Sequence, residues 1–116
     1  MSKYYIAIKD STLDSKHPVS YKEVQGEPVT IKGFEEIDFF LHKDIKAEHL
    51  GKTKWAISEG RTGLMIPYTG ATEAYAKDIV ALKLKEFGLE RVKQVIEESL
   101  VNGHSPRYDD KGELAK

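Results

Sequence analysis

Cysteine does not occur in this chain of 116 residues. Its absence excludes disulfide bonds, thiolate zinc sites, iron–sulfur clusters and cysteine nucleophiles, and it is typical of proteins in a reducing compartment. Long apolar runs are missing too. Residues 1–10 (MSKYYIAIKD) lack the apolar run of a signal peptide, and no stretch approaches the roughly 20 apolar residues of a membrane span. These absences predict a soluble, cytoplasmic protein that does not contact a membrane.

A surplus of positive charge is also absent, because 18 Lys and Arg stand against 19 Asp and Glu, for a formal net charge of -1. A dedicated nucleic-acid binder usually carries such a surplus, since the neutralisation of phosphates supplies most of its affinity. The charge balance therefore disfavours nucleic acid as a partner and leaves it as an alternative only. The length and a hydrophobic content of 40% are those of one globular domain with a single core.

Alternation of apolar and polar residues predicts several strands. Residues 3–9 (KYYIAIK), 29–32 (VTIK) and 36–43 (EIDFFLHK) each alternate with a period of two. Residues 19–28 (VSYKEVQGEP) are ambiguous, because capping-box spacing favours one helical turn, whereas the glycine and proline that follow make a short strand an equal alternative. Residues 44–54 form a polar excursion that predicts a short helical turn ending at a glycine.

The clearest local pattern predicts a hairpin. Residues 55–58 and 64–66 alternate on either side of the glycine-containing turn 58–63 (SEGRTG). The amides of such a turn could also form a small nest for an anion, supported by the charge of Arg61. A turn explains every residue of the segment, since glycines allow positive φ and the serine and threonine form local hydrogen bonds. The sequence therefore favours a turn over a binding site here.

Two amphipathic helices follow the hairpin. Residues 72–87 and 89–100 have helical apolar periodicity, and Gly88 between them is typical of a helix C-terminus. Residues 104–116 have no periodicity, so we expect a single globular domain over residues 1–103 and a flexible C-terminal tail. The predicted fold is α+β: a small, mostly antiparallel sheet of four to five strands, covered on one face by the two C-terminal helices.

The residues expected to point into the core share apolar character and a place on the inner face of a predicted strand or helix. They are Tyr4, Ile6, Ile8, Val29, Ile31, Phe39, Leu41, Trp55, Ile57, Leu64, Ile66, Ile79, Val80, Leu82, Phe87, Val92 and Ile96. In the first helix, Tyr75, Ile79 and Leu82 form one apolar stripe and Ala76, Val80, Leu84 and Phe87 form another, which predicts a broad buried face.

The sequence contains no catalytic signature. Neither a phosphate-binding loop nor a G-x-S-x-G nucleophile elbow is present, so no catalytic residue and no cofactor are predicted. The histidines have none of the spacings of a zinc site, and we expect no metal ligands. We expect them to face solvent or to be satisfied by hydrogen bonds; they are His17, His42, His49 and His104.

Five residues are candidates for binding. Lys83 falls inside the apolar face of the first helix, where its stem can snorkel to water or, if it is buried, its charge needs a partner. Glu59, on the Trp55 face of the hairpin, is the natural partner for a buried Lys83. Lys52, Lys54 and Arg61, around the hairpin of residues 52–63, could contact phosphates. Lys83 and Glu59 suggest a small-molecule site, whereas the three basic residues around the hairpin suggest a nucleic-acid site.

The segment 55–66 has the order W-x-I-S-x-x-x-T-G-L-x-I, and residues 70–76 read G-A-T-E-A-Y-A. This pattern resembles small uncharacterised proteins of Gram-positive bacteria and their phages. The hairpin that leads into a capped helix is also similar to antitoxin-like partial RNase H folds and to arm-binding domains of integrases. The resemblance covers only these two segments. It implies a fold element, and no functional residue is carried over from it.

A well-specified fold without a catalytic signature favours a non-enzymatic interaction or regulatory protein that binds another protein. The surfaces we expect it to use are an exposed sheet face or the edge of the hairpin, and self-association into a homo-oligomer is a possibility of the same kind. Two alternatives remain from the sequence. One is a weak nucleic-acid binder that uses the basic hairpin, and the other is a small-molecule-binding or enzyme domain around Lys83.

Overall fold

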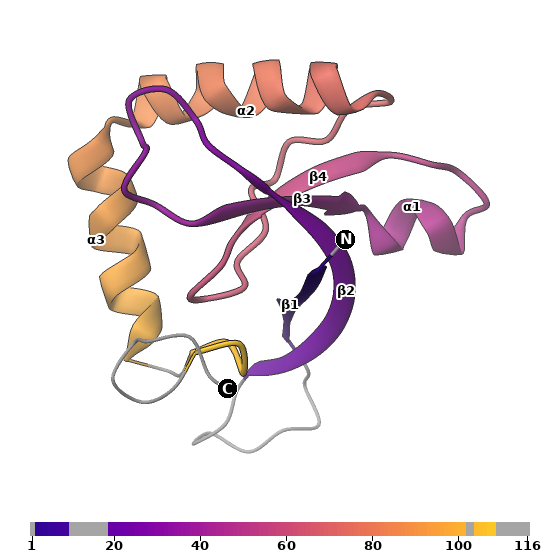
Figure 1. Ribbon diagram of the computed structural model, residues 1–116, viewed down its shortest axis with the longest axis horizontal. Helices are drawn as coiled ribbons and strands as arrows, with labels where there is room; N and C mark the ends of the chain where they lie inside the picture. The colour runs from indigo at the N-terminus through magenta and orange to yellow at the C-terminus, as the bar shows by residue number, and fades with distance from the viewer. Residues whose placement is uncertain (1, 10–18, 102–103, 109–116) are drawn as a thin grey trace.

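The computed structural model describes residues 2–9, 19–101 and 104–108. In the described part of the chain, four strands form one sheet of order β1-β2-β3-β4, in which every neighbouring pair is antiparallel. The α+β prediction is therefore confirmed (Figure 1). In chain order the elements are β1 (Ser2–Lys9), β2 (Val19–Val29), β3 (Phe39–Lys43), α1 (Ile45–His49), β4 (Trp55–Glu59), α2 (Glu73–Phe87) and α3 (Leu89–Leu100).

Strand β2 bends at Gly26, which pairs with Ser2 of β1 on one side and with His42 of β3 on the other. A Cβ atom at Gly26 would lie 3.0 Å from the ring of Tyr4 and 3.1 Å from the ring of Phe40. These two rings stack with their centroids 4.3 Å apart. Because Gly26 has no side chain, the ring of Tyr4 from β1 and the ring of Phe40 from β3 can stack on each other across β2.

The ambiguous segment 19–28 is a strand, and the strand predicted at 29–32 is wrong beyond Val29, the last residue of β2. Residues 30–38 instead form a loop, because the N–H of Phe34 donates to the carbonyl of Ile31 and the N–H of Ile37 donates to that of Phe34. These bonds turn the chain twice and bury all three apolar side chains of the loop.

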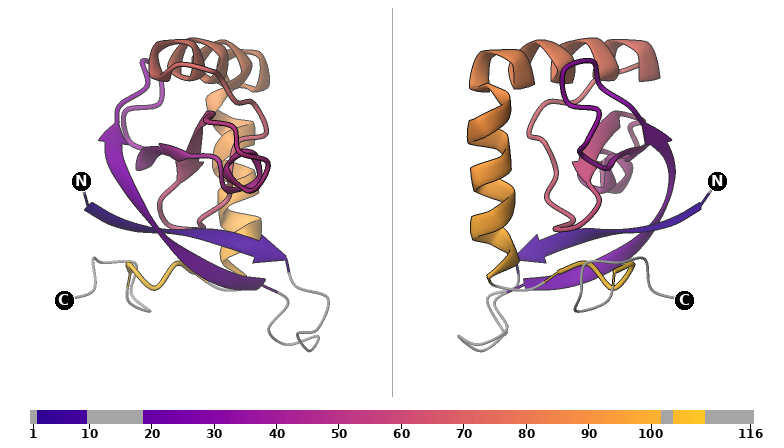
Figure 2. Two further views of the ribbon diagram at one scale, coloured as in Figure 1. Left: turned by 90° about the vertical axis from the view of Figure 1, so that its right-hand side faces the viewer. Right: turned by 60° about the vertical axis from the view of Figure 1, so that its left-hand side comes forward.

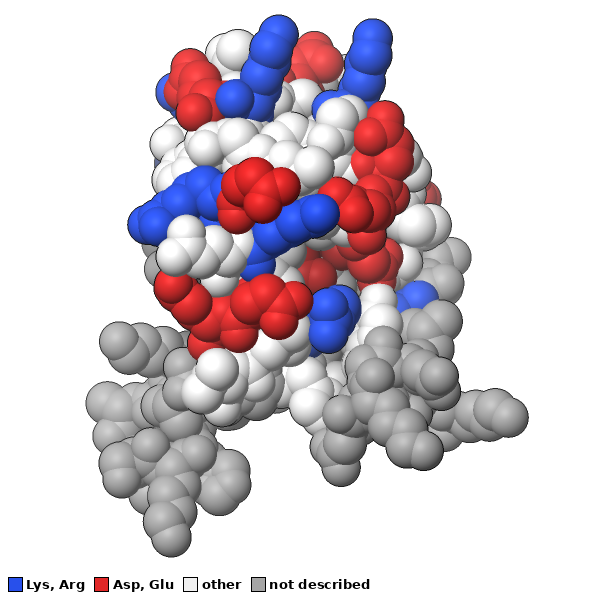
Figure 3. Space-filling view, turned by 90° about the vertical axis from the view of Figure 1, so that its left-hand side faces the viewer, with Lys and Arg blue, Asp and Glu red and all other residues white. Residues whose placement is uncertain are grey.

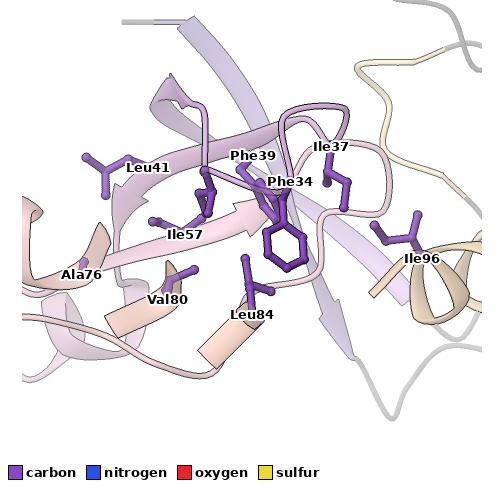
Figure 4. Close-up of a cluster of buried hydrophobic side chains, with 10 residues drawn as sticks. Phe34, Ile37, Phe39, Leu41, Ile57, Ala76, Val80, Leu84 and Ile96 are labelled. Atoms are coloured by element: carbon purple, nitrogen blue, oxygen red, sulfur yellow. The ribbon is translucent and has the colours of Figure 1, made fainter. Parts of the chain in front are cut away.

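Both faces of β3 are buried. On one face Phe39 and Leu41 join Ile57 against Val80 and Leu84 of α2 (Figure 4). On the other face the ring of Phe40 packs with Tyr4 and Ile6 of β1. The predicted sheet with a single covered face is therefore incomplete, since β1 turns across the second face of the central strand. At β3, therefore, neither face of the sheet is free to serve as the exposed binding surface that the sequence suggested.

The two C-terminal helices meet in an L shape (Figures 1 and 2). Helix α2 begins after Thr72, whose hydroxyl accepts the N–H of Tyr75 at 3.1 Å, as expected for an N-cap. It ends at Gly88, which has a φ of 88° and donates its N–H to the carbonyl of Leu84. Helix α3 starts directly after this residue, and Lys93 ties it to Glu36 at 2.8 Å.

Residues 104–108, predicted as the start of a flexible tail, pack on the sheet. Ser105 is fully buried, and its N–H donates to the carbonyl of Arg61 at 2.7 Å. The guanidinium of Arg107 lies 4.1 Å from the ring centroid of Tyr4. Folded structure therefore continues to Tyr108, five residues past the predicted domain boundary at residue 103; residues 109–116 lie outside the described part.

Candidate functional site

The turn after β4 binds an anion, and that anion belongs to the chain itself. The carboxylate of Glu59 accepts the N–H of Arg61 at 2.8 Å and both the N–H and the hydroxyl of Thr62 at 2.7 Å. Gly63 has a φ of 72°, as the turn requires. Segment 58–63 is therefore both of the structures that the sequence suggested. It is a turn whose amides form an anion nest, and the carboxylate of Glu59 occupies that nest.

Glu59 is buried, with only 4% of its surface exposed. Burial raises the pKa of its carboxyl above the ordinary value, although the hydrogen bonds from Thr62 and Arg61 oppose the change. The turn that Glu59 organises holds distant segments in place. The carbonyl of Gly63 accepts the N–H of Ala7 at 2.8 Å, and the carbonyl of Arg61 accepts that of Ser105. One buried carboxylate therefore supports contacts to both ends of the described chain.

Residues 64–68, which we name the return arm, run back along β4 and form one wall of an apolar groove. Helices α2 and α3 form the other wall, and the groove has a volume of about 380 Å³. Three of its large apolar side chains remain exposed: Phe87 at 60%, Leu64 at 37% and Val95 at 36%. The apolar lining residues are Phe39, Leu64, Met65, Ile66, Pro67, Tyr68, Leu84, Phe87, Val92, Val95 and Ile96.

Lys83 and Glu59 both line this groove, but they do not form the predicted pair. The Nζ of Lys83 lies 3.5 Å from a carboxylate oxygen of Glu86 and 5.3 Å from the ring centroid of Tyr68. Its side chain is 32% exposed, in agreement with the snorkelling alternative. The carboxylate of Glu59 is hydrogen-bonded within its own turn and does not pair with Lys83. Lys83 is therefore a cation in the lining of the groove that reaches its opening.

The three basic residues of the predicted nucleic-acid site are not brought together. Lys52 and Lys54 are exposed before β4, and Arg61 follows it. The five residues of β4 separate them by about 17 Å, at a rise of about 3.3 Å per residue. Arg61 instead lines a polar cleft of about 470 Å³ together with the acidic Glu36, Asp38 and Glu97. On the face that carries α3, basic and acidic side chains alternate (Figure 3).

A buried serine–histidine pair lies inside the sheet, and sequence reasoning missed it. The Nε2 of His42 lies 2.7 Å from the hydroxyl of Ser58, while its Nδ1 lies 2.9 Å from the carbonyl of Lys43. Because a carbonyl can only accept, Nδ1 carries the proton and Nε2 accepts the serine hydroxyl. Both side chains are at most 1% exposed, so no substrate reaches them and the pair is structural.

Only the strand register could have revealed this pair. Phe40 pairs with Ser58 and His42 pairs with Ala56, which makes Ser58 and His42 diagonal neighbours on one face. The sequence alone does not fix that register. It did predict that the histidines would be satisfied or solvent-facing, and His42 is satisfied; His17 lies outside the described residues.

Within residues 2–9, 19–101 and 104–108, no group of three or more histidine and carboxylate side chains could hold a metal ion. No helix in that part of the chain combines the length and the apolar character needed to cross a membrane. No family model, no curated protein and no solved structure matches this chain. The resemblance of segments 55–66 and 70–76 to small bacterial and phage proteins therefore stays a prediction.

Proposed function

We propose that this protein is a non-catalytic interaction protein that binds another protein through the groove between the return arm and helices α2 and α3. The observation that carries the proposal is the exposure of large apolar side chains around a concave site. Phe87, Leu64 and Val95 surround a cavity of about 380 Å³ and remain open to water. Aromatic and aliphatic side chains next to a pocket are typical anchors of protein interfaces.

The polar groups near the groove favour binding over catalysis. The carboxylate of Glu59 already accepts three hydrogen bonds from its own turn. Ser58 and His42, which have the chemistry of a nucleophile and base, are sealed inside the sheet. A general base must come within hydrogen-bonding reach of its substrate, and neither group can do so in this arrangement.

The test compares two polar substitutions at exposed apolar positions. Phe87→Gln removes an anchor of the groove, whereas Leu50→Gln changes a residue that is 75% exposed at the end of α1 and does not line the groove. Each tagged variant and the wild type is incubated in lysate of the source cell with nuclease. Any stoichiometric partner is then purified and its affinity for all three proteins is measured.

We expect Phe87→Gln to weaken the partner by about tenfold or more, as for the truncation of an interface anchor, and Leu50→Gln to leave the affinity unchanged. Matching thermal melts of the two variants show that the fold is intact. Equal affinities for both variants, or partners that disappear with nuclease, contradict the proposal. A complex formed between copies of the chain itself identifies the partner as a second copy.

A small-molecule function is the second candidate, and the volume of the groove supports it. Ligand pockets typically measure about 300–1,000 Å³ and are mostly apolar with a few polar groups, as this groove is with Lys83. Its ligand would be an apolar acid. Thermal melts with decanoate test this candidate, and equal stabilisation of the wild type and Lys83→Met rejects it.

A further inference from the structure

The backbone of the return arm has a free edge next to the groove. The bonds that join the arm to β4 run from Glu59 N–H to Leu64 C=O and from Ile66 N–H to Ile57 C=O, both 2.9 Å long. In an antiparallel pair, the residue between two such bonds points its own N–H and C=O away from the neighbouring strand. Met65 occupies that position, so its two backbone groups face outward from β4.

This edge is short because of Pro67. The chain bends at Pro67, where the N–H of Tyr68 donates to the carbonyl of Ile66 at 2.8 Å, and proline has no N–H to donate. Only one backbone pair, at Met65, is therefore available before the proline ends the edge. A long strand cannot add to it, and a helix has no spare N–H and C=O to pair with it. The edge fits a short extended segment that makes two hydrogen bonds.

The lining of the groove includes one cationic side chain, Lys83. Lys83 holds its ammonium over the ring of Tyr68 and is 3.5 Å from Glu86, an exposed contact that contributes little and can be exchanged. The other ionisable lining residue, Glu59, is buried and engaged by the turn. A visiting segment thus meets an apolar groove beside one accessible cation, and an acidic group on the segment complements it.

From these three observations we infer that the partner's contact segment is a short extended peptide with a bulky apolar side chain two residues away from an acidic residue. Its backbone pairs with Met65, the apolar side chain enters the groove and the acidic group meets Lys83. Alternate side chains of an extended segment point to the same side, so one peptide can make these contacts at once. The inference rests on the proposed function and names the chemistry of its partner.

The probe is a displayed library of linear seven-residue peptides, selected on the wild-type protein. A consensus peptide is then synthesised in three forms: unchanged, with its acidic residue replaced by the amide, and N-methylated at single backbone positions. Affinities are measured for the wild type, Lys83→Gln, Phe87→Gln and the control Leu50→Gln. Circular dichroism of the peptides, free and bound, reports whether the bound form is helical.

We expect apolar–acidic motifs to be enriched. Lys83→Gln and the amide peptide should each weaken binding about two- to fivefold, and together no more than either alone, as for one exposed ion pair. One N-methyl position should weaken binding about two- to tenfold, the usual effect of losing one hydrogen bond. Leu50→Gln should bind as the wild type does.

The outcomes separate the inference from the function on which it rests. Peptides that need Phe87 but show no coupling to Lys83, or that bind as helices, overturn the inference and leave the groove as the binding site. Peptides that bind Phe87→Gln equally well overturn both. A selection that enriches nothing overturns the inference, and if decanoate then stabilises the wild type but not Phe87→Gln, the small-molecule candidate replaces the proposed function.

Discussion

At the scale of single residues, two buried polar side chains are each satisfied by hydrogen bonds: Glu59 accepts them from its own turn, and His42 bonds with Ser58 inside the sheet. Glu59 was expected to point inward, and it does. Lys83 was its expected partner only if that lysine were buried, and Lys83 instead reaches water, as the snorkelling alternative predicts. Amides two and three residues away reach the carboxylate of Glu59 without closing a long loop. Phe40 and His42 were not among the residues expected in the core. They are buried because β1 covers that face, which depends on the bend at Gly26 and not on any local pattern.

The stability of the protein should depend on pH through His42. Burial lowers the pKa of His42 in the folded state below its ordinary value of 6.5. Between the lowered pKa of the folded state and 6.5, the unfolded chain therefore binds a proton at this histidine and the folded protein does not. The free energy of unfolding is highest above pH 6.5 and decreases as the pH falls through this window. The slope is at most about 1.4 kcal/mol per pH unit.

Urea unfolding of the wild type, His42→Gln and His49→Gln between pH 7.5 and 4.5 measures this slope. His49 is exposed at the end of α1 and serves as the control. We expect the loss of stability below pH 6.5 to be smaller in His42→Gln than in the wild type and unchanged in His49→Gln, while the raised pKa of Glu59 contributes a slope of the opposite sign in all three proteins. A slope that is unchanged in His42→Gln would assign it to other groups.

Two glycines with the same backbone conformation should respond differently to alanine. Gly63 and Gly51 both have a φ of 72°, so each substitution carries the same conformational strain of about 1–2 kcal/mol. A Cβ at Gly63 would lie 2.9 Å from backbone atoms of Ala7 and Tyr5, whereas one at Gly51 meets nothing within 4 Å. Gly63→Ala should thus lower the free energy of unfolding by about 1–3 kcal/mol more than Gly51→Ala. Equal losses by chemical denaturation would show that β1 yields to the added methyl.

At the scale of elements, those with a clear local signal were predicted, whereas the course of β2 and of the loop that follows it depends on distant pairing and was not. Thr72 and Gly88 mark the ends of α2, and Gly51 follows the short α1, as the sequence indicated. Strand β2 was ambiguous because its eleven residues belong to two different pairings, and the loop 30–38 replaced the rest of a predicted strand. The bend of β2 depends on the strands that pair with it, and the local sequence pattern carries no information about those partners.

The residues that we expected in the core also divide into those that the structure buries and those that it leaves exposed. Most of them lie inside or pack against the buried clusters, and the side chain of Ile8 lies outside the described ones. Leu64, Leu82 and Phe87 are exposed instead, between 37% and 60%. The broad apolar face of α2 is thus two faces, of which the sheet covers only the one with Ala76 and Val80. The sequence could not tell which stripe the sheet would take.

Alanine substitutions two residues apart on α2 test this division. Leu84 is 5% exposed in the core and Leu82 is 52% exposed. Leu84→Ala should lower the free energy of unfolding by about 2–5 kcal/mol, because it leaves a cavity. Leu82→Ala should change it by no more than about 0.5 kcal/mol, as surface substitutions usually do. Comparable losses in thermal or urea unfolding would mean that both stripes are covered in solution.

At the scale of the whole molecule, the two ends of the described chain hold each other. Arg107 donates to the carbonyl of Lys3 at 2.7 Å and covers the ring of Tyr4, while the hydroxyl of Tyr108 donates to Asp38. Burial and the Asp38 carboxylate raise the pKa of Tyr108, so the phenol keeps its proton for this bond. The segment 104–108 gave no sequence signal because it has no periodic pattern and depends on single contacts.

Removing one of these contacts should loosen only the part of the molecule that they hold. Arg107→Ala removes a cation–π contact of about 1 kcal/mol and one hydrogen bond. We expect faster amide hydrogen exchange in β1 and residues 104–108, and unchanged exchange in α2 and α3. The control is Arg91→Ala, whose side chain donates to Gln94 on the surface of α3. Uniformly faster exchange would mean that the segment supports the whole fold.

The contact between the two ends also constrains the order of events during synthesis. The four strands follow one another along the chain, so their pairing can begin as each one leaves the ribosome. The ring of Tyr4 receives its cover from Arg107, which is synthesised only about a hundred residues later. A nascent chain stalled between these two residues therefore carries an uncovered aromatic surface on β1, where a chaperone can bind it.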